Sequence, residues 1–330
     1  MLATGANGAG KTNLLESLHV GTQGFSPRTR SDAELVRFGA EAARIALAGD
    51  RAGSPLEVEL ILQPREARRA RLNGARLESA EQLRREVATL VFTPDRLVVV
   101  KGGPAARRAY FDRVLARALP SLAPLPTDYA AALAQRNASL RGVAGGFSSR
   151  EALAPWTQRV AALGAQLVEA RQRAVDLLAP RFAERAGELG LEDAIIRYDG
   201  EPPTLDLLEA RLERDLERGS TGLGPHLDDV AIMAGERDLR AFGSQGEQRL
   251  AVLSLLLAEA ELVSEHRGFP PLLLLDDVLS ELDPERRRIL AARVRAYGQS
   301  VITTTSAAAL PDEPDQLLEV RASAAGTVVA

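Results

Sequence analysis

A glycine-rich segment at residues 5–12, GANGAGKT, constrains this chain more than any other feature. It has the spacing G-x-x-x-x-G-K-[ST], in which backbone N–H groups surround a polyphosphate while Lys11 neutralises it and Thr12 ligates Mg²⁺. Residues 13–18 are predicted to continue as a helix, whose N-terminus adds its dipole to the anion site. Taken alone, the segment could also be a chance glycine-rich turn, because almost no strand precedes it.

A second segment, LLLLDDVLSELD at residues 272–283, points to the same chemistry. Its four leucines predict a fully buried strand, which ends in Asp276, where a carboxylate can hold the same Mg²⁺. Asp277 follows and is a candidate to orient or deprotonate the attacking water, although a carboxylate merely hydrogen-bonded at the strand end is the alternative. The two segments together predict a site for ATP and Mg²⁺. The residues predicted to surround the phosphates are Gly5, Ala6, Asn7, Gly8, Ala9, Gly10, Lys11 and Thr12.

A third segment, SQGEQ at residues 244–248, has two interpretations. Ser244 could simply cap a helix predicted at residues 247–265. The order of the three motifs, however, resembles that of the ABC class of ATPases, in which a Ser-x-Gly-x-Gln loop contacts the γ-phosphate bound to a second subunit. This resemblance implies an ATP-dependent homodimer. The nucleotide contacts that it implies from this loop are Ser244, Gln245, Gly246, Glu247 and Gln248.

The same resemblance assigns roles near Asp277. It implies that Ser280 and Asp283 face the dimer partner and that Thr304, in the run of threonines at residues 303–305, senses the γ-phosphate; three threonines could equally be strand formers. Many members of the class have Glu where this chain has Asp277. The shorter side chain moves the carboxylate by about one methylene, and a misplacement of about 1 Å can cost on the order of a hundredfold in rate. We therefore expect slow hydrolysis.

The remaining pattern predicts an α/β protein with an inserted helical lobe. An antiparallel sheet is expected around residues 56–63 and the Asn73-Gly74 hairpin signal. Later strands alternate with helices, which predicts a parallel core with flanking helices. The expected strands lie at residues 87–92, 230–233, 239–242, 272–275 and 300–304, and the expected helices at residues 247–265 and 284–297.

The inserted lobe is expected at residues 104–218, between ATPase segments 1–103 and 219–330, because its apolar residues recur at three- and four-residue spacing. Its longest helical run, residues 150–189, would measure about 60 Å if unbroken, and its prolines and glycines predict that it is broken. Long coiled-coil arms are therefore not expected. The predicted breaks are at Pro155, Gly164, Pro180 and Gly187.

Composition limits the partners. The 330 residues include no cysteine, which excludes disulfides, Cys-ligated zinc and thiol catalysis, and no run approaches the ~18 apolar residues of a membrane span. We expect a cytoplasmic protein without a membrane partner. With three histidines and no cysteine, metal binding at His226 would lack partner ligands. Because the net charge is −4, any DNA site must be a local basic patch. The alternative is that the basic residues of such a patch only form a solvated helix face. The candidate DNA contacts are Lys101, Arg107, Arg108, Arg28 and Arg30.

Over nearly its whole length the chain resembles the RecF family, bacterial recombination-mediator ATPases of the SMC-like ABC class. The resemblance implies a P-loop ATPase head that forms an ATP-dependent clamp on duplex DNA at gaps or junctions. It also implies a DNA-stimulated ATPase that, with RecR and RecO, assists RecA loading in repair, replication restart and the SOS response. The segments that carry it, besides the three motifs, are PRTRSDAELVRFG, LVFTPDRLVVVKGGPAARRAYFD, DYAAALAQRNASL and GPHLDD.

Two positions depart from the family pattern. Only four residues precede Gly5, where the family has further strands, so a late-assigned or truncated start is expected. Leu227 stands where the family has Arg, which removes any polar contact of that side chain. Two alternatives remain: the head of another SMC-like DNA-repair machine, which long arms would mark, and a transporter motor, which would normally carry His after the last core strand and need a membrane partner.

Overall fold

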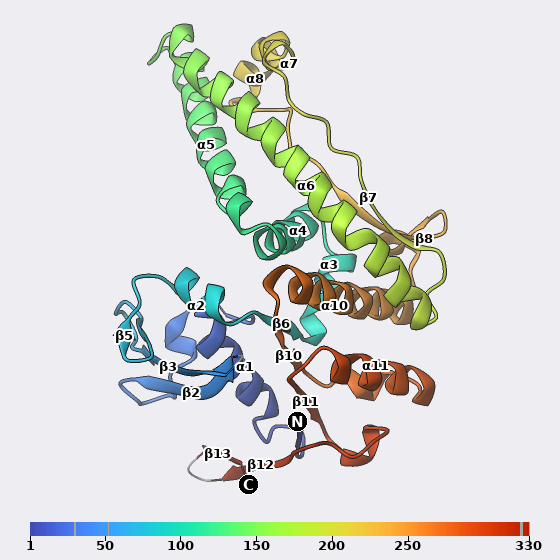
Figure 1. Ribbon diagram of the computed structural model, residues 1–330. Helices are drawn as coiled ribbons and strands as arrows, with labels where there is room; N and C mark the ends of the chain where they lie inside the picture. Colours follow the sequence, from blue (N-terminus) through green and yellow to red (C-terminus); the bar gives the residue numbers. More distant parts are fainter. Residues whose placement is uncertain (30, 52, 324–325, 330) are drawn as a thin grey trace. The chain divides into compact units, whose positions relative to one another are not determined.

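A computed structural model describes residues 1–29, 31–51, 53–323 and 326–329 (Figure 1). The chain forms two compact units. The first combines Met1–Arg96 with Val263–Ala330, and the second is Leu97–Leu262. Residues 219–262 thus belong to the unit that contains the helices, whereas the sequence assigned them to the ATPase lobe. The predicted lobe boundaries at 104 and 218 therefore differ from the boundaries of these two compact units, and the division into an ATPase lobe and an inserted lobe stays a prediction.

The first unit is built on a six-stranded sheet with the order β13-β12-β1-β11-β10-β6. All neighbours are parallel except the terminal β12–β13 hairpin. The parallel core that the sequence predicts is therefore confirmed. β10 lies between two neighbours, and Leu273, Leu274 and Leu275 are each at most 1% exposed. The strands are β1 (Leu2–Thr4), β6 (Thr89–Phe92), β10 (Leu272–Leu275), β11 (Ser300–Thr304), β12 (Leu317–Ser323) and β13 (Gly326–Val329).

A four-stranded antiparallel sheet, β2-β3-β4-β5, completes the strands of this unit. The predicted hairpin is present: Asn73 and Gly74 both have positive φ, 48° and 80°, as the two central residues of a type I′ turn require. The strands are β2 (Ala43–Arg51), β3 (Ser54–Leu62), β4 (Arg69–Leu72) and β5 (Ala75–Arg76). The helical segments are α1 (Lys11–Gln23), η1 (Asp32–Glu34), α2 (Ala80–Glu86), η5 (Val278–Glu281), α11 (Pro284–Ala296) and η6 (Ala307–Ala309).

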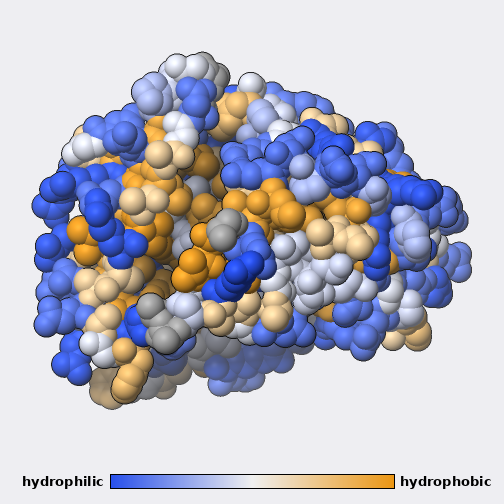
Figure 2. All heavy atoms as spheres, turned by 90° about the horizontal axis from the view of Figure 1, so that it is seen from below, coloured by the Kyte–Doolittle hydropathy of each residue, from blue (hydrophilic) through white to orange (hydrophobic). Residues whose placement is uncertain are grey.

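Apolar side chains remain exposed on the terminal hairpin of this sheet. Leu317 is 53% exposed, Val328 49% and Val329 42%. The view from below shows apolar residues on the face that carries β12 and β13 (Figure 2). The sheet edge therefore presents an apolar surface next to the first unit's glycine-rich loop, because Thr327 of β13 lies against Gly10.

The second unit is mainly helical, and its core lies between α4, α5 and α6, where Leu115, Tyr129, Val160, Leu163 and Leu167 pack together. Its helical segments are α3 (Val98–Lys101), α4 (Pro104–Ala118), η3 (Pro120–Leu122), α5 (Leu125–Ala144), η4 (Arg150–Leu153), α6 (Ala154–Glu188), α7 (Leu205–Ala210), α8 (Leu212–Arg218) and α9 (Leu239–Phe242). Two segments, η2 (Pro94–Leu97) and α10 (Gln245–Arg267), run from one unit into the other.

The predicted breaks in the long helix are wrong: α6 is one continuous helix of 35 residues, about 50 Å long. Pro155 lies in the first turn, where a missing N–H costs nothing. Gly164 permits close packing, because a Cβ there would lie 2.5 Å from Pro203 Cγ. Pro180 does lie inside the helix, and burial of neighbours such as Leu178 offsets its lost hydrogen bond. Tertiary packing overrides the local signal here.

Two strand predictions after residue 219 also need correction. Residues 239–242 form the short helix α9, because Asp238 caps it by accepting the Arg240 N–H at 2.8 Å. The strand predicted at 230–233 exists as β8 (Val230–Ala234), but it joins a three-stranded antiparallel sheet with β7 (Ala194–Tyr198) and β9 (Arg237–Asp238) rather than the parallel core. Among the described residues, no helix has the length and apolar character needed to cross a membrane.

Candidate nucleotide-binding site

The glycine-rich loop joins β1 to α1 in the first unit and has the strained geometry that its glycines permit. Gly8 and Gly10 have φ values of 78° and 103°, in the left-handed region that favours glycine. A Cβ on Gly10 would lie 2.0 Å from Thr327 Oγ1, so the approach of the terminal hairpin also requires glycine. Gly5 is equally confined, since a Cβ there would lie 2.2 Å from the Val320 carbonyl oxygen.

Lys11 is the first residue of α1 and lies folded over this loop. Its side chain is buried, at 8% exposure, and its ammonium donates to the carbonyl oxygens of Gly5 at 2.7 Å and Ala6 at 2.9 Å. A flexible ammonium can exchange these carbonyl partners for phosphate oxygens, which a planar guanidinium would do less well in so narrow a space. The positive charge and the helix N-terminus are thus concentrated at one point.

Thr12 and Asp276 meet, although 264 positions separate them in the sequence. The Thr12 hydroxyl lies 3.0 Å from Asp276 Oδ2 and 3.2 Å from Oδ1. Asp276 follows β10 and is 7% exposed, and its backbone N–H donates to the Phe92 carbonyl at 2.9 Å. The strand pairing of β10 with β6 thus continues one residue beyond the strand and fixes the backbone that carries this carboxylate.

These oxygen groups fit Mg²⁺. A hydroxyl and a carboxylate are hard ligands, and Mg²⁺ is usually bound through one or two carboxylates together with substrate phosphates. Within the described part of the chain, no three His, Cys, Asp or Glu side chains gather as metal ligands. A Mg²⁺ site completed by nucleotide phosphates needs no such cluster.

Asp277 has an unusual backbone for a residue with a side chain. Its φ of 48° and ψ of 32° place it in the left-handed region, and its N–H donates to Thr303 Oγ1 at 3.0 Å. Its carbonyl accepts from the Ser280 hydroxyl at 3.0 Å. Its Oδ1 is buried and has no hydrogen-bond partner among the described residues. Strained backbone and an unsatisfied buried oxygen are both typical of functional sites.

The three threonines of residues 303–305 do not share one environment. Thr303 is fully buried and its hydroxyl donates to Asp276 Oδ1 at 2.7 Å. Thr304, the predicted γ-phosphate sensor, is 2% exposed and its hydroxyl lies 3.3 Å from the Ser306 carbonyl. Sequence reasoning missed the contact of Thr303 with Asp276, because nothing in a run of threonines tells which hydroxyl faces the neighbouring strand. The sensing role of Thr304 stays a prediction.

The SQGEQ segment, in the second unit, begins α10 with a reciprocal cap. The Glu247 N–H donates to Ser244 Oγ at 3.2 Å, and the Ser244 N–H donates to Glu247 Oε2 at 2.8 Å. Hydrogen bonds from Arg237 and from the Ser244 backbone lower the pKa of Glu247 to about 2. The capping interpretation of Ser244 is therefore confirmed. Gln248 Nε2 donates to the Leu239 carbonyl at 2.8 Å, which ties the segment to α9.

Asp283 begins α11 in a similar way. Its Oδ1 accepts the Arg286 N–H at 2.9 Å, and this backbone hydrogen bond lowers the pKa of the Asp283 carboxyl. Both Asp283 and Ser280 are exposed. The predicted contacts of these two residues, and of residues 244–248, with a second subunit stay predictions.

The candidate DNA contacts differ in their environment. Arg107 is only 2% exposed and forms a bidentate pair with Asp229, with Nε–Oδ1 at 2.7 Å and Nη2–Oδ2 at 2.5 Å. Its Nη1 donates to the Gly102 carbonyl at 2.9 Å. Partial burial opposes ionisation of Asp229, but the hydrogen bonds from Arg107 outweigh it and lower the pKa of that carboxyl. We therefore remove Arg107 from the candidate DNA contacts, because its guanidinium is enclosed and already paired.

The other candidates are more accessible. Lys101 is exposed, and Arg28 is 45% exposed with Glu16 at 3.2 Å. Arg108 donates to the Asp228 carbonyl, and partial burial lowers its pKa. Arg30 lies outside the described residues.

His226 of the GPHLDD segment is held by both ring nitrogens. Nε2 lies 3.0 Å from the Thr221 carbonyl, which can only accept, so Nε2 carries the proton. Nδ1 then accepts from the Tyr129 hydroxyl at 2.8 Å. Burial lowers the pKa of His226, in agreement with a neutral ring. Leu227, in contrast, is 57% exposed.

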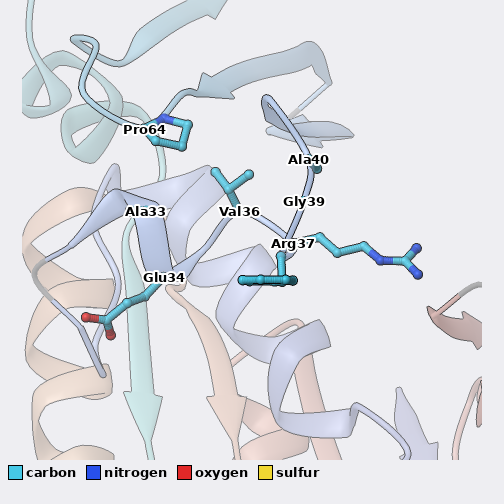
Figure 3. Close-up of a pocket in the computed structure, with 8 residues that line it drawn as sticks. Ala33, Glu34, Val36, Arg37, Gly39, Ala40 and Pro64 are labelled. Atoms are coloured by element: carbon cyan, nitrogen blue, oxygen red, sulfur yellow. The ribbon is translucent and has the colours of Figure 1, made fainter.

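An open pocket of about 450 Å³ lies elsewhere in the first unit (Figure 3). The side chains of Glu34 and Arg37 extend away from each other at its sides. None of the predicted site residues lines it. Its lining residues are Ala33, Glu34, Val36, Arg37, Phe38, Gly39, Ala40 and Pro64.

The chain is similar to known proteins over nearly its whole length. Residues 1–328 match the family described as "RecF/RecN/SMC N terminal domain". The chain is 36% identical over 315 residues to the DNA replication and repair protein RecF of Heliobacterium modesticaldum, covering 92% of this chain and 85% of the relative. It is 37% identical over 322 residues to RecF of Myxococcus xanthus, covering 92% and 84%.

Solved structures give the same result. A structure described as RecF-ATP in the RecFOR pathway superposes with a TM-score of 0.83 at 29% identity, covering 97% of this chain and 89% of that one. An Smc head bound to the C-winged helix domain of ScpA has a TM-score of 0.58 at 16% identity, covering 100% and 88%, which shows a shared fold alone. Since the family model spans nearly the whole chain and the RecF relatives match it over most of their own length, the chain belongs to the RecF family of DNA replication and repair proteins.

Proposed function

We propose that this chain is a slow, DNA-stimulated ATPase that works as a dimerising clamp on gapped or junction DNA. The observation that carries the nucleotide part of the proposal is the meeting of Thr12 and Asp276 at 3.0 Å beside the folded Lys11. The RecF relatives and the structure described as RecF-ATP support the assignment of the ligand. Among SMC-like machines we favour RecF, because the structure described as RecF-ATP superposes with a TM-score of 0.83 at 29% identity, whereas the Smc head gives 0.58 at 16%.

The residues of the site would divide the work of phosphoryl transfer. The backbone N–H groups of residues 5–12 and Lys11 bind and neutralise the phosphates. Thr12 and Asp276 would hold Mg²⁺, which would neutralise phosphate charge. Asp277 would orient the attacking water and accept a proton from it.

The SQGEQ segment would complete the site of a second subunit. Its capping box fixes the start of α10, so the positive end of this helix is presented in one direction. In an isologous dimer each subunit would offer this segment, together with Ser280 and Asp283, to the ATP of its partner. ADP lacks the γ-phosphate and would lose the contact, so hydrolysis would open the clamp.

DNA would be held through phosphates. Lys101 and Arg28 are the exposed basic candidates, and affinity should therefore fall linearly on a log–log plot against salt. In the cytoplasm the clamp would act with RecR and RecO to assist RecA loading during repair, replication restart and the SOS response.

The test combines hydrolysis, nucleotide binding and sedimentation. Wild-type protein should release phosphate from Mg·ATP slowly, faster with gapped duplex, and should dimerise with ATP but not with ADP. Asp277→Asn should keep ATP binding, hydrolyse about tenfold more slowly or worse, as general-base catalysis is typically worth more than that, and accumulate dimers. Asp312→Asn, which changes an exposed carboxylate of the first unit, is the matched control and should behave as wild type. Equal sedimentation with ATP, ADP and no nucleotide would contradict the clamp.

A further inference from the structure

Thr303 occupies a central position beneath the two aspartates. Its hydroxyl oxygen lies 2.7 Å from Asp276 Oδ1 and 3.0 Å from the Asp277 backbone nitrogen. The side chain is fully buried on β11, a strand whose register with β1 pairs Ala3 with Thr303. One hydroxyl therefore contacts both residues on which metal binding and hydrolysis would depend.

The directions of these two hydrogen bonds follow from chemistry. The Asp277 N–H can only donate, so the Thr303 oxygen accepts it. The ionised carboxylate of Asp276 can only accept, so the single hydroxyl proton of Thr303 points to Oδ1. The hydroxyl then uses its proton and one lone pair, and its rotamer is determined. Thr303 thus holds Asp276 Oδ1, while Thr12 lies 3.2 Å from Oδ1 and 3.0 Å from Oδ2.

The same contact stabilises the strained peptide of Asp277. A left-handed backbone at φ 48° is unfavourable for a residue with a Cβ, and it persists only where neighbours determine it. The hydrogen bond from the Asp277 N–H to Thr303 is one such determinant, and the Ser280 hydroxyl on the Asp277 carbonyl is another. Together they fix the backbone that carries this carboxylate, whose buried Oδ1 has no hydrogen-bond partner among the described residues.

We propose that Thr303 is a positioning residue that aims the Asp276 carboxylate at Mg²⁺ and the Asp277 carboxylate at the attacking water through one hydroxyl. Its side chain is fully buried, so it would act through these two residues. The proposal rests on the ATPase function proposed above and adds to it a residue to which the resemblance gives no role of this kind. A residue that acts on the metal ligand should change how much Mg²⁺ tightens ATP binding, which an ordinary core threonine would not.

The experiment compares Thr303→Val with Thr303→Ser. Valine keeps the shape and strand preference of threonine and removes the hydroxyl, whereas serine keeps the hydroxyl. The binding readout is the Kd for ATP with excess Mg²⁺ and with EDTA. We expect Thr303→Val to bind ATP in EDTA within about twofold of wild type, to lose most of the tightening by Mg²⁺, and to hydrolyse about 10- to 100-fold more slowly, as expected for a carboxylate misplaced by about 1 Å. Thr303→Ser should keep both the tightening of ATP binding by Mg²⁺ and the rate of hydrolysis within about threefold of wild type, because serine keeps the hydroxyl that positions the carboxylates.

Thr89→Val is the matched control. Thr89 is a buried strand threonine of the same sheet, 1% exposed, and its hydroxyl donates to Thr22 at 2.9 Å, away from the aspartates. It should retain wild-type Mg²⁺ dependence. Equal losses in Thr303→Val and Thr89→Val, or loss of ATP binding in EDTA with Thr303→Val, would mean that Thr303 only supports the sheet. Wild-type values for Thr303→Val would overturn the positioning role alone. Wild-type protein whose ATP binding ignores Mg²⁺ would overturn the proposed function as well.

Discussion

The pair of Arg107 and Asp229 allows a quantitative test of whether this arginine is structural or binds DNA. Arg107 is 2% exposed and Asp229 is 39% exposed. Breaking a buried ion pair by removing one partner costs about 3–5 kcal/mol. For Arg107→Ala we expect the lower end, about 3 kcal/mol, because the remaining carboxylate of Asp229 can be hydrated. For Asp229→Ala we expect about 4 kcal/mol, because the remaining guanidinium is enclosed and cannot reach water.

The assay uses the single tryptophan of the chain. Trp156 lies on α6, and Arg107 and Asp229 belong to the same second unit. Its fluorescence during urea unfolding therefore reports on the unit that contains the pair. The double variant should be less destabilised than the sum of the single variants by about 1–3 kcal/mol. In parallel, Arg107→Ala should leave the salt slope of DNA binding unchanged, whereas Lys101→Ala should reduce it by about one. A stable Arg107→Ala protein with a flatter salt slope would refute the structural role.

Three further predictions concern the glycine-rich loop, the partly buried His226 and the cap of α10. Gly10→Ala should weaken ATP binding by about tenfold or more in a nucleotide titration, because Gly10 has a φ of 103° and a Cβ there would lie 2.0 Å from Thr327. Gly74→Ala is the control: Gly74 also has a positive φ but lies in open space, so the change should cost about 1–2 kcal/mol of stability and leave ATP binding intact. Since burial lowers the pKa of His226 in the folded state, unfolding takes up protons, so stability should fall as pH drops below about 6.5, and His226→Gln should lose this part of the pH dependence in urea titrations. The pKa of Glu247 is lowered to about 2, so the carboxylate should stabilise the fold at pH values above its ordinary pKa, and this stabilisation should be lost as the pH falls toward 2. Glu247→Gln should remove this pH dependence of stability in thermal melts recorded from about pH 5 to about pH 2.

The sequence predicted those parts of the fold and of the site that depend on short, strongly patterned segments. The glycine and lysine spacing of residues 5–12, the leucine run of β10 and the Asn73-Gly74 dipeptide are each typical of one local structure, and their elements appear where expected. It did not predict the continuity of α6 through Pro180, nor the helix at residues 239–242, since both depend on packing and capping by residues elsewhere.

Side-chain partnerships were the least predictable part of the site. Arg107 and Lys101 look alike in a sequence, but only the fold encloses the first of them with Asp229. Thr303 and Thr304 are likewise adjacent, and only the strand register turns one hydroxyl to Asp276. Motif spacing predicts the residues that touch a ligand, whereas the residues that support them depend on contacts between distant segments.

The meeting of Thr12 with Asp276 also has a consequence for synthesis on the ribosome. The second unit, Leu97–Leu262, is continuous in the chain and can fold as soon as it has been translated. The first unit cannot, because β1 pairs with β11 and β12, so its amino-terminal strand must wait for the last part of the chain. Closing so long a loop makes this step slow relative to the helical unit. A nascent chain should therefore carry a folded helical unit well before it can hold a nucleotide, and chaperones that protect exposed strands would find their substrate in residues 1–96.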